Sequence, residues 1–278
     1  MSYLSVIILT KDEEKNLPSA LASLRGLDAK CFIVDSGSQD RTVEIAKEAG
    51  CLIAVHEFVN YAQQLNWAID NLPINTEWVM RLDADERLMP ELAEELKKTL
   101  CDPLLKANGI VIKRRNFFWG RWIRFGGYYP IWLLRIWRRG TARCENRHMD
   151  EHMVLDNGSL LYLKNDFIDE NQKGLTFWTN KHNGYSSREA MDMLAPEAHI
   201  DRDRTAGQAS RKRFWKERIY ANSPKFLRAF LYWFFRYFLL LGFLDGLPGL
   251  VFHFLQGFWY RFLVDAKLNE LERKAKQQ

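Results

Sequence analysis

The chain has 278 residues, of which 47% are hydrophobic and 27% charged, and its formal net charge is +5. This composition excludes a disordered or fibrous protein, and the length allows one large domain or a domain with a sizeable appendage. The four cysteines are widely spaced and form no Cys-x-x-Cys pair. This spacing argues against a zinc ribbon or a disulfide scaffold and indicates a reducing compartment.

The first half of the chain alternates short apolar runs with helical patterns. Each apolar run is rich in β-branched residues and ends in polar turn residues, which is typical of βαβ units and a parallel sheet buried on both faces. Strands are expected at residues 4–10, 31–35, 51–56, 77–83 and 109–115, and helices at 13–24, 40–49, 62–71 and 90–100.

Aromatic residues make up 14% of the chain and gather near its C-terminus, from Phe214 to Phe262. Charged residues interrupt this segment, so no apolar run reaches the ~18–20 residues of a transmembrane helix. The N-terminus shows no signal-peptide pattern. We therefore expect a cytoplasmic protein that does not cross a membrane.

The aromatic segment predicts two helices, near residues 224–241 and 247–274, separated by glycines and a proline. Both are rich in aromatic and basic residues, as are amphipathic helices that lie on an anionic leaflet. A hydrophobic subdomain and a homo-oligomer interface remain alternatives. We divide the chain into residues 1–200 and a helical region, 201–278, for docking on an anionic membrane surface.

Carboxylates follow three of the expected strands, where open α/β sheets bind ligands. Neither a G-x-G-x-x-G fingerprint nor a P-loop is present. Carboxylates suit a phosphate site when a divalent cation stands between them. Asp83 and Asp85 alternate as strand residues do, so both point to one face. The strand-end segments are Thr10 to Glu13, Asp35 to Ser38 and Arg81 to Asp85.

Three motifs carry a family resemblance: SVIILTKDEEKNL, then IVDSGSQDRT, then MRLDADERL. In this order and spacing the chain resembles the family 2 glycosyltransferases of the GT-A fold. The VDSGS and LDADE forms are similar to those of bacterial lipopolysaccharide-core β-glucosyltransferases and related polysaccharide enzymes. The implied fold class is α/β, a mixed, mainly parallel sheet flanked by helices, followed here by amphipathic C-terminal helices.

The resemblance implies a nucleotide-diphosphate sugar donor, UDP-linked, and Mn²⁺ or Mg²⁺. It assigns Thr10 and Glu13 to the base and ribose, Asp35 to the base, Asp83 to the ribose or metal, and Asp85 to the metal. Many relatives carry an Arg-Asn pair in the following helix, where this chain has Leu65 and Asn66. Arg81 is then expected to take over that phosphate or ribose contact.

The catalytic base is expected in a later acidic pair, because inverting transfer needs a carboxylate to accept the acceptor hydroxyl proton. Asp150 and Glu151 resemble the family's acidic motif, with the order of the two residues reversed. We favour Glu151 as the base and keep Asp150 as the second candidate.

The same segment supports a remote alternative. His148, Glu151 and His152 match the H-x-x-E-H pattern of a zinc peptidase, which requires a helix and a third, distant ligand. This interpretation leaves the strand-end carboxylates without a role.

Basic and aromatic residues interleave between residues 113 and 147, as they do in nucleic-acid grooves. The small net charge argues against a nucleic-acid partner, and none is expected. We expect the aromatic residues between Phe117 and Trp137 to flank a sugar acceptor instead.

The sequence thus predicts an inverting, metal-dependent glycosyltransferase. Its expected acceptor is a lipid-linked saccharide of bacterial lipopolysaccharide or surface polysaccharide synthesis, at the inner face of the plasma membrane. A protein acceptor and a nucleotidyltransferase reaction are the alternatives.

Overall fold

The computed structural model describes residues 3–145, 152–194 and 223–277. Within them the chain forms two compact units. The first contains residues 3–114, 132–145 and 152–172, and the second contains residues 115–131, 173–194 and 223–277. The second unit therefore includes a segment from the middle of the chain in addition to the C-terminal helices.

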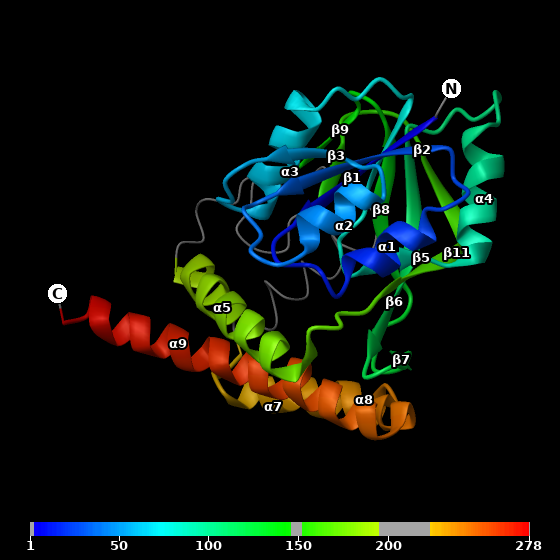
Figure 1. The fold of residues 1–278 in the computed structure, drawn as a ribbon. Helices are drawn as coiled ribbons and strands as arrows, with labels where there is room; N and C mark the ends of the chain where they lie inside the picture. The colour runs from blue at the N-terminus through cyan, green and yellow to red at the C-terminus, as the bar shows by residue number, and fades with distance from the viewer. Residues whose placement is uncertain (1–2, 146–151, 195–222, 278) are drawn as a thin grey trace. The chain divides into compact units, whose positions relative to one another are not determined.

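The first unit is built on a mixed sheet (Figure 1). Four parallel strands form one half, and antiparallel pairings follow in the other half. In sheet order the strands are β3 (Leu52–Val55), β2 (Ala29–Asp35), β1 (Leu4–Thr10), β4 (Trp78–Arg81), β8 (Ile131–Arg138), β6 (Gly109–Phe118), β11 (Leu160–Asp169) and β5 (Glu86–Leu88). A separate antiparallel pair consists of β9 (Ala142–Cys144) and β10 (Met153–Leu155).

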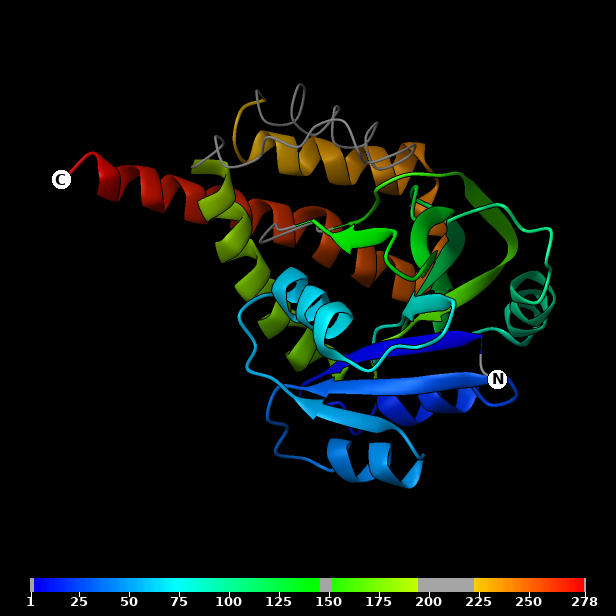
Figure 2. The ribbon, with the colours of Figure 1, turned by 90° about the horizontal axis from the view of Figure 1, so that it is seen from above.

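Helices cover both faces of the parallel half, as Figures 1 and 2 show. Along β1, Val6 and Ile8 pack with residues of α1, α2 and α4, whereas Ile7 packs with residues of α3. This alternation follows from the two-residue period of a strand. The helices are α1 (Leu17–Ser23), α2 (Thr42–Glu48), α3 (Tyr61–Asn71) and α4 (Pro90–Leu100).

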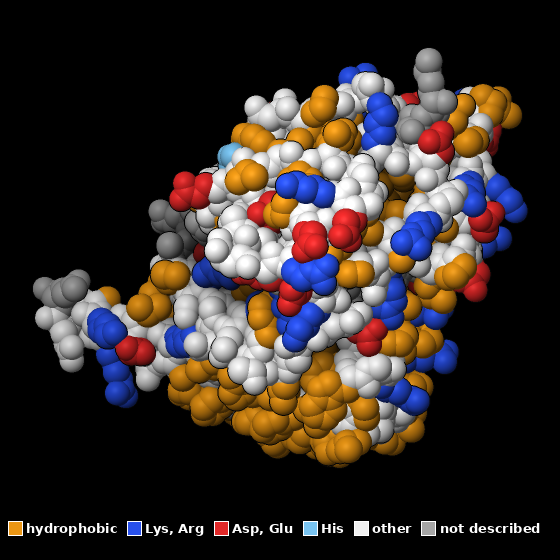
Figure 3. Space-filling model, viewed as in Figure 1, with side chains coloured by type: hydrophobic (Ala, Val, Ile, Leu, Met, Phe, Trp, Pro, Cys, Tyr) orange, Lys and Arg blue, Asp and Glu red, His pale blue; other side chains and the backbone are white. Residues whose placement is uncertain are grey.

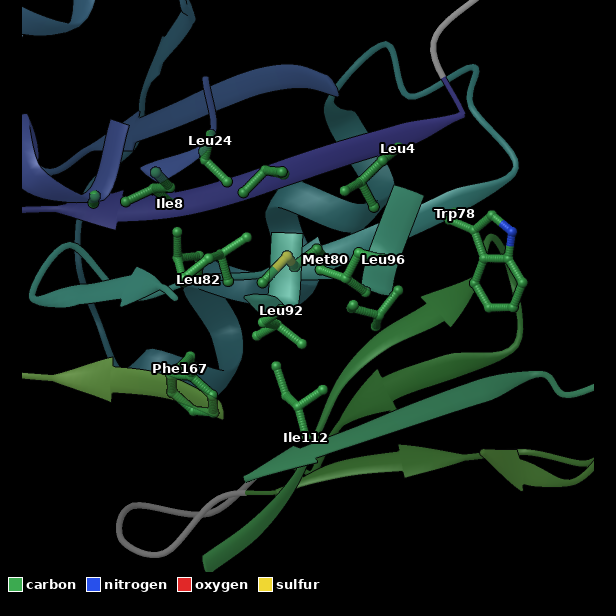
Figure 4. Packing of buried hydrophobic residues seen from close by; sticks show 14 of the residues in the cluster. Leu4, Ile8, Leu24, Trp78, Met80, Leu82, Leu92, Leu96, Ile112 and Phe167 are labelled. Carbon is green, nitrogen blue, oxygen red and sulfur yellow. The ribbon is translucent and has the colours of Figure 1, made fainter. Parts of the chain in front are cut away.

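The core between the sheet and α4 contains large, fully buried side chains (Figure 4). Met80 and Phe167 from the sheet and Leu92 and Leu96 from α4 belong to one cluster, and none of the four is exposed to solvent. Leucines recur on one face of α4 at helical spacing and give the helix this buried side. Packing of the cluster fixes the sheet whose strand ends carry the candidate site.

The expected elements of the first half are all present, with one clear difference. The first helix begins at Leu17 rather than at residue 13. The backbone N–H groups of Glu13 and Glu14 donate to the side chains of Thr42, the first residue of α2, and of Asp40 in the loop before it. Glu13 and Glu14 therefore form a turn instead of a helix. Pro18 then fits the first turn of α1, where its missing N–H costs nothing.

The second unit is mainly helical. Its strand β7 (Arg121–Ile123) pairs with the end of β6. Its helices are α5 (Gly174–Leu194), α7 (Leu227–Phe234), α8 (Gly246–Phe252) and α9 (Tyr260–Ala275), joined by the π-helical segments η3 (Phe235–Leu239) and η5 (His253–Trp259) and the 3₁₀ turn η4 (Gly242–Asp245). Both helices expected from the sequence are thus present, and the break between them lies next to Leu241.

Polar contacts connect α5 to α9 within this unit. Glu189 of α5 accepts hydrogen bonds from the Tyr260 hydroxyl at 2.6 Å and from Arg261 at 2.8 Å. No single helix in the described part of the chain is both long and apolar enough to cross a membrane. One helix pair, Leu227–Leu239 with Gly242–Ala275, meets these limits of length and composition jointly, with a bend of 70° between its arms.

Candidate active site at the carboxyl ends of the strands

Thr10 and Asp35 end two neighbouring parallel strands and are partners in register. The Thr10 hydroxyl donates to the buried Asp35 carboxylate at 2.9 Å. The same carboxylate accepts the backbone N–H groups of Gly37 at 2.9 Å and Ser38 at 2.8 Å, and also the Ser38 hydroxyl. A carboxylate offers about four acceptor positions, so protein donors already use those of Asp35. Asp35 therefore fixes the loop that follows β2, and its contact with a base stays a prediction.

The loops after β1 and β2 are bonded to each other. Asp12, at a positive φ of 54°, donates its N–H to the Ser38 hydroxyl at 2.8 Å. Its carboxylate accepts the N–H of Gln39 at 2.7 Å. The N–H of Glu13 donates to Thr42 at 2.7 Å. These bonds across the two loops bring Glu13 into the same strand-end region as Thr10 and Asp35.

Asp83, just beyond β4, is surrounded by cationic and hydroxyl donors. Arg81 holds both carboxylate oxygens, through Nε and Nη2, each at 3.3 Å. The Tyr61 hydroxyl donates to Oδ1, and Nη2 of Arg135 lies 3.4 Å from Oδ2. Burial acts to raise the pKa of Asp83, but Arg81 and Arg135 outweigh it, so the pKa is lowered. Asp83 is therefore a fixed anion.

Arg135 forms a buried ion pair beneath this site. Nη2 of Arg135 contacts Oε1 of Glu86, and both side chains are at most 4% exposed. Oε2 of Glu86 accepts the backbone N–H of Asp83 at 3.0 Å. Burial raises the pKa of Glu86 to about 8, although Arg135 acts to lower it. The pair links Asp83 to the middle of β8.

Asp85 is held from a distant segment. Its carboxylate accepts the side-chain amide of Asn171 at 3.0 Å, and its carbonyl accepts the N–H of Glu170 at 2.9 Å. The N–H of Gln172 donates at 2.8 Å to Asn16, whose amide donates at 2.7 Å to the Glu13 carboxylate. Residues 170–172 thus connect the loop after β1 to the loop after β4.

Three residues that contact the carboxylates of Asp83 and Asp85, namely Tyr61, Arg135 and Asn171, were not predicted from the sequence. The sequence does indicate a role for Arg135, because a single arginine inside the apolar run of β8 must find a buried partner. Nothing in the sequence pattern indicates such a role for Tyr61 or Asn171, since each contacts its carboxylate only through the tertiary fold. All three position a carboxylate that the sequence had identified.

A divalent cation at this site would take few ligands from the protein itself. No group of three or more His, Cys, Asp or Glu side chains in the described ranges could by itself hold a metal. Mg²⁺ at phosphate-transfer sites needs only one or two carboxylates, because substrate phosphates supply further ligands. Asp85 fits that role, with Asn171 orienting it. Asp83 would have to give up contacts with Arg81 and Arg135 to bind a metal.

Leu65 and Asn66, the departure from the family pattern, have structural roles in α3. Leu65 is fully buried. The Asn66 amide donates to the carbonyl of Cys144 at 2.8 Å, and its oxygen accepts the Cys144 N–H at 3.0 Å. Asn66 thus anchors β9, while Arg81 stacks on Tyr61, 4.0 Å from its ring centroid, beside Asp83.

Asp150 and Glu151, the predicted catalytic pair, lie outside the described residues, as does His148 of the alternative zinc pattern. Next to them, the backbone of Glu145 pairs with that of His152, whose ring nitrogen lies 3.2 Å from the Glu145 carboxylate. Strand β10 begins at the following residue. His152 is therefore not in the helix that the zinc-peptidase interpretation requires.

The aromatic residues expected to flank an acceptor fall into different environments. Trp137 is fully buried in the sheet core, and Phe118 is buried in an apolar cluster of the second unit. The expectation is therefore wrong for these two, whose positions are explained by packing. Trp119, which is 54% exposed, and the half-buried Trp122 remain accessible.

Comparison with known proteins places this geometry in a family. The model of the family described as Glycosyl transferase family 2 matches residues 5–168. An uncharacterized glycosyltransferase of Rickettsia typhi is 35% identical over 97 residues, which are 35% of this chain and 32% of that protein. LpsC of Rhizobium meliloti, a lipopolysaccharide core biosynthesis glycosyltransferase, is 29% identical over 276 residues, covering 91% of this chain and 89% of LpsC.

The match thus spans about a third of the length of the Rickettsia relative and most of LpsC. Among solved structures, S. aureus TarS 1–349 in complex with UDP-GlcNAc aligns with 100% of this chain and 92% of that chain. Its identity is 14% and its TM-score 0.48. This likeness is too distant for a ligand or a site residue to be carried over.

Proposed function

Because this chain belongs to glycosyl transferase family 2, we propose that it transfers a sugar from a nucleotide-diphosphate donor to an acceptor hydroxyl. The observation that carries the proposal is the connected network at the strand ends. It joins Glu13 and Asp85 through residues 170–172, and it fixes Asp83 between two arginines. All of these strand-end carboxylates lie within the matched residues 5–168.

The donor, which we take to be UDP-linked, would lie across the ends of β1, β2 and β4. Thr10, Glu13 and Asp35 line the base and ribose side, with Asp35 acting by shaping its loop. Asp83 is an ionised acceptor for a ribose hydroxyl, and Arg81 next to it supplies positive charge toward the phosphates. Asp85 would hold Mn²⁺ or Mg²⁺, which neutralises charge on the departing nucleotide diphosphate.

Transfer is proposed to proceed by direct displacement with inversion. The acceptor oxygen forms a bond to the sugar C1 while the bond from C1 to the diphosphate oxygen breaks. The acceptor proton passes to a carboxylate, for which Glu151 is the first candidate and Asp150 the second.

We take the acceptor to be a lipid-linked saccharide of bacterial lipopolysaccharide or surface polysaccharide synthesis, at the inner face of the plasma membrane. The 29% identity to LpsC along 91% of the chain supports this choice. The exposed apolar side chains of the helical unit support a place at a membrane surface.

A panel of nucleotide sugars, each with Mn²⁺, Mg²⁺ or chelator, tests the donor site by thermal shift and by donor hydrolysis. One donor should stabilise the protein in the presence of a metal. Asp85→Asn should abolish the effect of the metal, whereas Asp102→Asn, at an exposed residue after α4, should behave like wild type. No response to any donor under any condition would contradict the proposed activity.

Glu151→Gln and Asp150→Asn, made separately, test the base. If one variant loses transfer but still binds the donor, the residue replaced in that variant is the base. Near-wild-type transfer in both variants would remove the assignment.

A further inference from the structure

The helical unit exposes a surface of leucine and phenylalanine side chains. Figure 3 shows hydrophobic side chains gathered over the region of α7 and α8. The exposed residues of α7, η3, η4 and α8, with the turn between them, are Leu227, Phe230, Leu231, Phe234, Phe235, Phe238, Leu239, Leu240, Leu241, Phe243, Leu244, Leu247 and Leu250. We call this set the apolar face. Contiguous apolar surface of this kind marks an interaction site.

The acidic groups in and next to the same segment are buried and paired. Arg228 and Asp265 form an ion pair with side chains 2% and 0% exposed. Asp245 is buried, and its carboxylate accepts the backbone N–H groups of Arg124 and Phe125, both at 3.1 Å. It is the only acidic residue between positions 224 and 264. The apolar face therefore has no exposed negative charge along this stretch.

Cations remain beside the apolar face. Nε of Arg236 donates to the carbonyl of Gly126 at 2.6 Å, and its guanidinium lies 3.7 Å from the Tyr128 ring centroid. Arg124, in the loop bonded to Asp245, is exposed. Neither arginine forms an ion pair with any residue that the structure describes. The region thus combines exposed apolar side chains with positive charge that no acidic residue in the described part of the chain neutralises.

We propose that the apolar face inserts into one leaflet of an anionic membrane without crossing it. The most exposed leucines of the apolar face, Leu239 at 62% and Leu247 at 68%, lie on either side of the turn between the two helical arms. The two arms meet at this turn with a bend of 70°, and we place the turn with its exposed leucines in the lipid. The inference rests on the proposed function in one respect, since a lipid-linked acceptor would lie in the same membrane.

Charge favours a lipid surface over a second copy of the chain. A two-fold dimer would place the same patch, with Arg124 and Arg236, against itself. Like charges would then meet in a partly desolvated interface. An anionic leaflet instead neutralises them while the apolar face is buried, and each basic residue near such a surface contributes about 1 kcal/mol, or roughly fivefold in affinity.

Flotation of the full-length chain with phosphatidylcholine vesicles, with and without phosphatidylglycerol, tests the proposal. Binding should require phosphatidylglycerol. Leu239→Asp and Leu247→Asp should each weaken binding by about tenfold or more, because each removes apolar burial and adds negative charge. Leu104→Asp is the matched control, since Leu104 is 81% exposed but belongs to the first unit. Arg124→Gln should weaken binding by roughly fivefold.

Three results would overturn the proposal. One is equal loss of binding in Leu104→Asp and Leu247→Asp. Another is protection of a tag placed after residue 278 from protease added outside the vesicles, because the bent helix pair would carry the tag inside if it crossed the bilayer as one broken span. The third is a concentration-dependent dimer that Leu247→Asp dissociates, with no vesicle binding by wild type. Donor-induced thermal shift in the absence of vesicles tests the proposed function separately. Failure of the membrane proposal is therefore distinguishable from failure of the proposed function.

Discussion

Replacing Arg135 by Met removes the guanidinium that pairs with Glu86 beneath the proposed donor site. The substitution keeps an unbranched side chain of similar length in β8 but removes the charge. Glu86 is 2% exposed, so water cannot replace the lost partner. Removing one member of a buried ion pair costs about 3–5 kcal/mol of unfolding free energy when the other member stays charged.

The cost depends on pH because burial raises the pKa of Glu86 to about 8. Well below that pKa Glu86 is protonated in the folded wild-type protein, so the loss at Glu86 is mainly that of a hydrogen bond worth about 1 kcal/mol. The contact of Arg135 with the ionised Asp83 is also lost, and this part of the cost is the same on both sides of about pH 8. Above it Glu86 is ionised, and Arg135 stabilises the charge. Without Arg135 the pKa of Glu86 rises further, so the difference in stability between wild type and variant grows as pH rises through about 8.

Urea unfolding of both proteins at about pH 6 and about pH 9.5 measures this dependence. The double variant Arg135→Met with Glu86→Gln is the control. Glutamine does not titrate, and its side-chain oxygen can still accept the N–H of Asp83. The double variant should therefore recover the pH-dependent part of the lost stability at the higher pH. Its free energy of unfolding, relative to wild type with Glu86→Gln alone, should change little between the two pH values.

A destabilisation by Arg135→Met that is the same at both pH values would refute this reasoning. So would failure of the second substitution to restore stability at the higher pH. Either result would mean that packing of the Arg135 stem, rather than its charge, stabilises this part of the sheet.

Two further predictions concern the donor site. Asn171→Ala removes the amide that orients the Asp85 carboxylate, and residues that orient a metal ligand typically affect metal affinity by about 10- to 100-fold. A titration of donor hydrolysis with Mn²⁺ should show this shift in the metal midpoint with the fold intact, and an unchanged midpoint would contradict the role of Asn171. Tyr61→Phe removes a hydroxyl donor to Asp83, and hydrogen bonds to charged groups contribute about 1.5–3 kcal/mol. Donor affinity measured by calorimetry should fall by roughly tenfold, while equal affinity would show that the two arginines hold Asp83 without the hydroxyl.

The strands and helices of the first half could be predicted because their signals are local. The apolar run from Leu4 to Thr10 and the leucine pattern from Pro90 to Leu100 give elements with those same bounds in the structure. The family match over residues 5–168 and the mixed sheet flanked by helices confirm the expected GT-A type fold. Prediction was less accurate for the first helix, because contacts with Asp40 and Thr42, 26 to 29 residues away, decide where it begins.

The site could be predicted only in part, for a related reason. Motifs identified the carboxylates at the strand ends, since residue type and position after a strand can be read along the chain. Their partners could not be identified in that way. Arg135 is 52 residues from Asp83, and Asn171 is 86 residues from Asp85.

The sequence by itself determined the family, the order of elements and which carboxylates stand at the strand ends. Tertiary structure decided what each carboxylate does. Asp35 is occupied by its own loop, Asp83 is fixed between two arginines, and Asp85 is oriented by an amide from beyond β11. The physical reason is that charge state and hydrogen bonding depend on burial and on neighbours across the sheet, which strand order and register bring together.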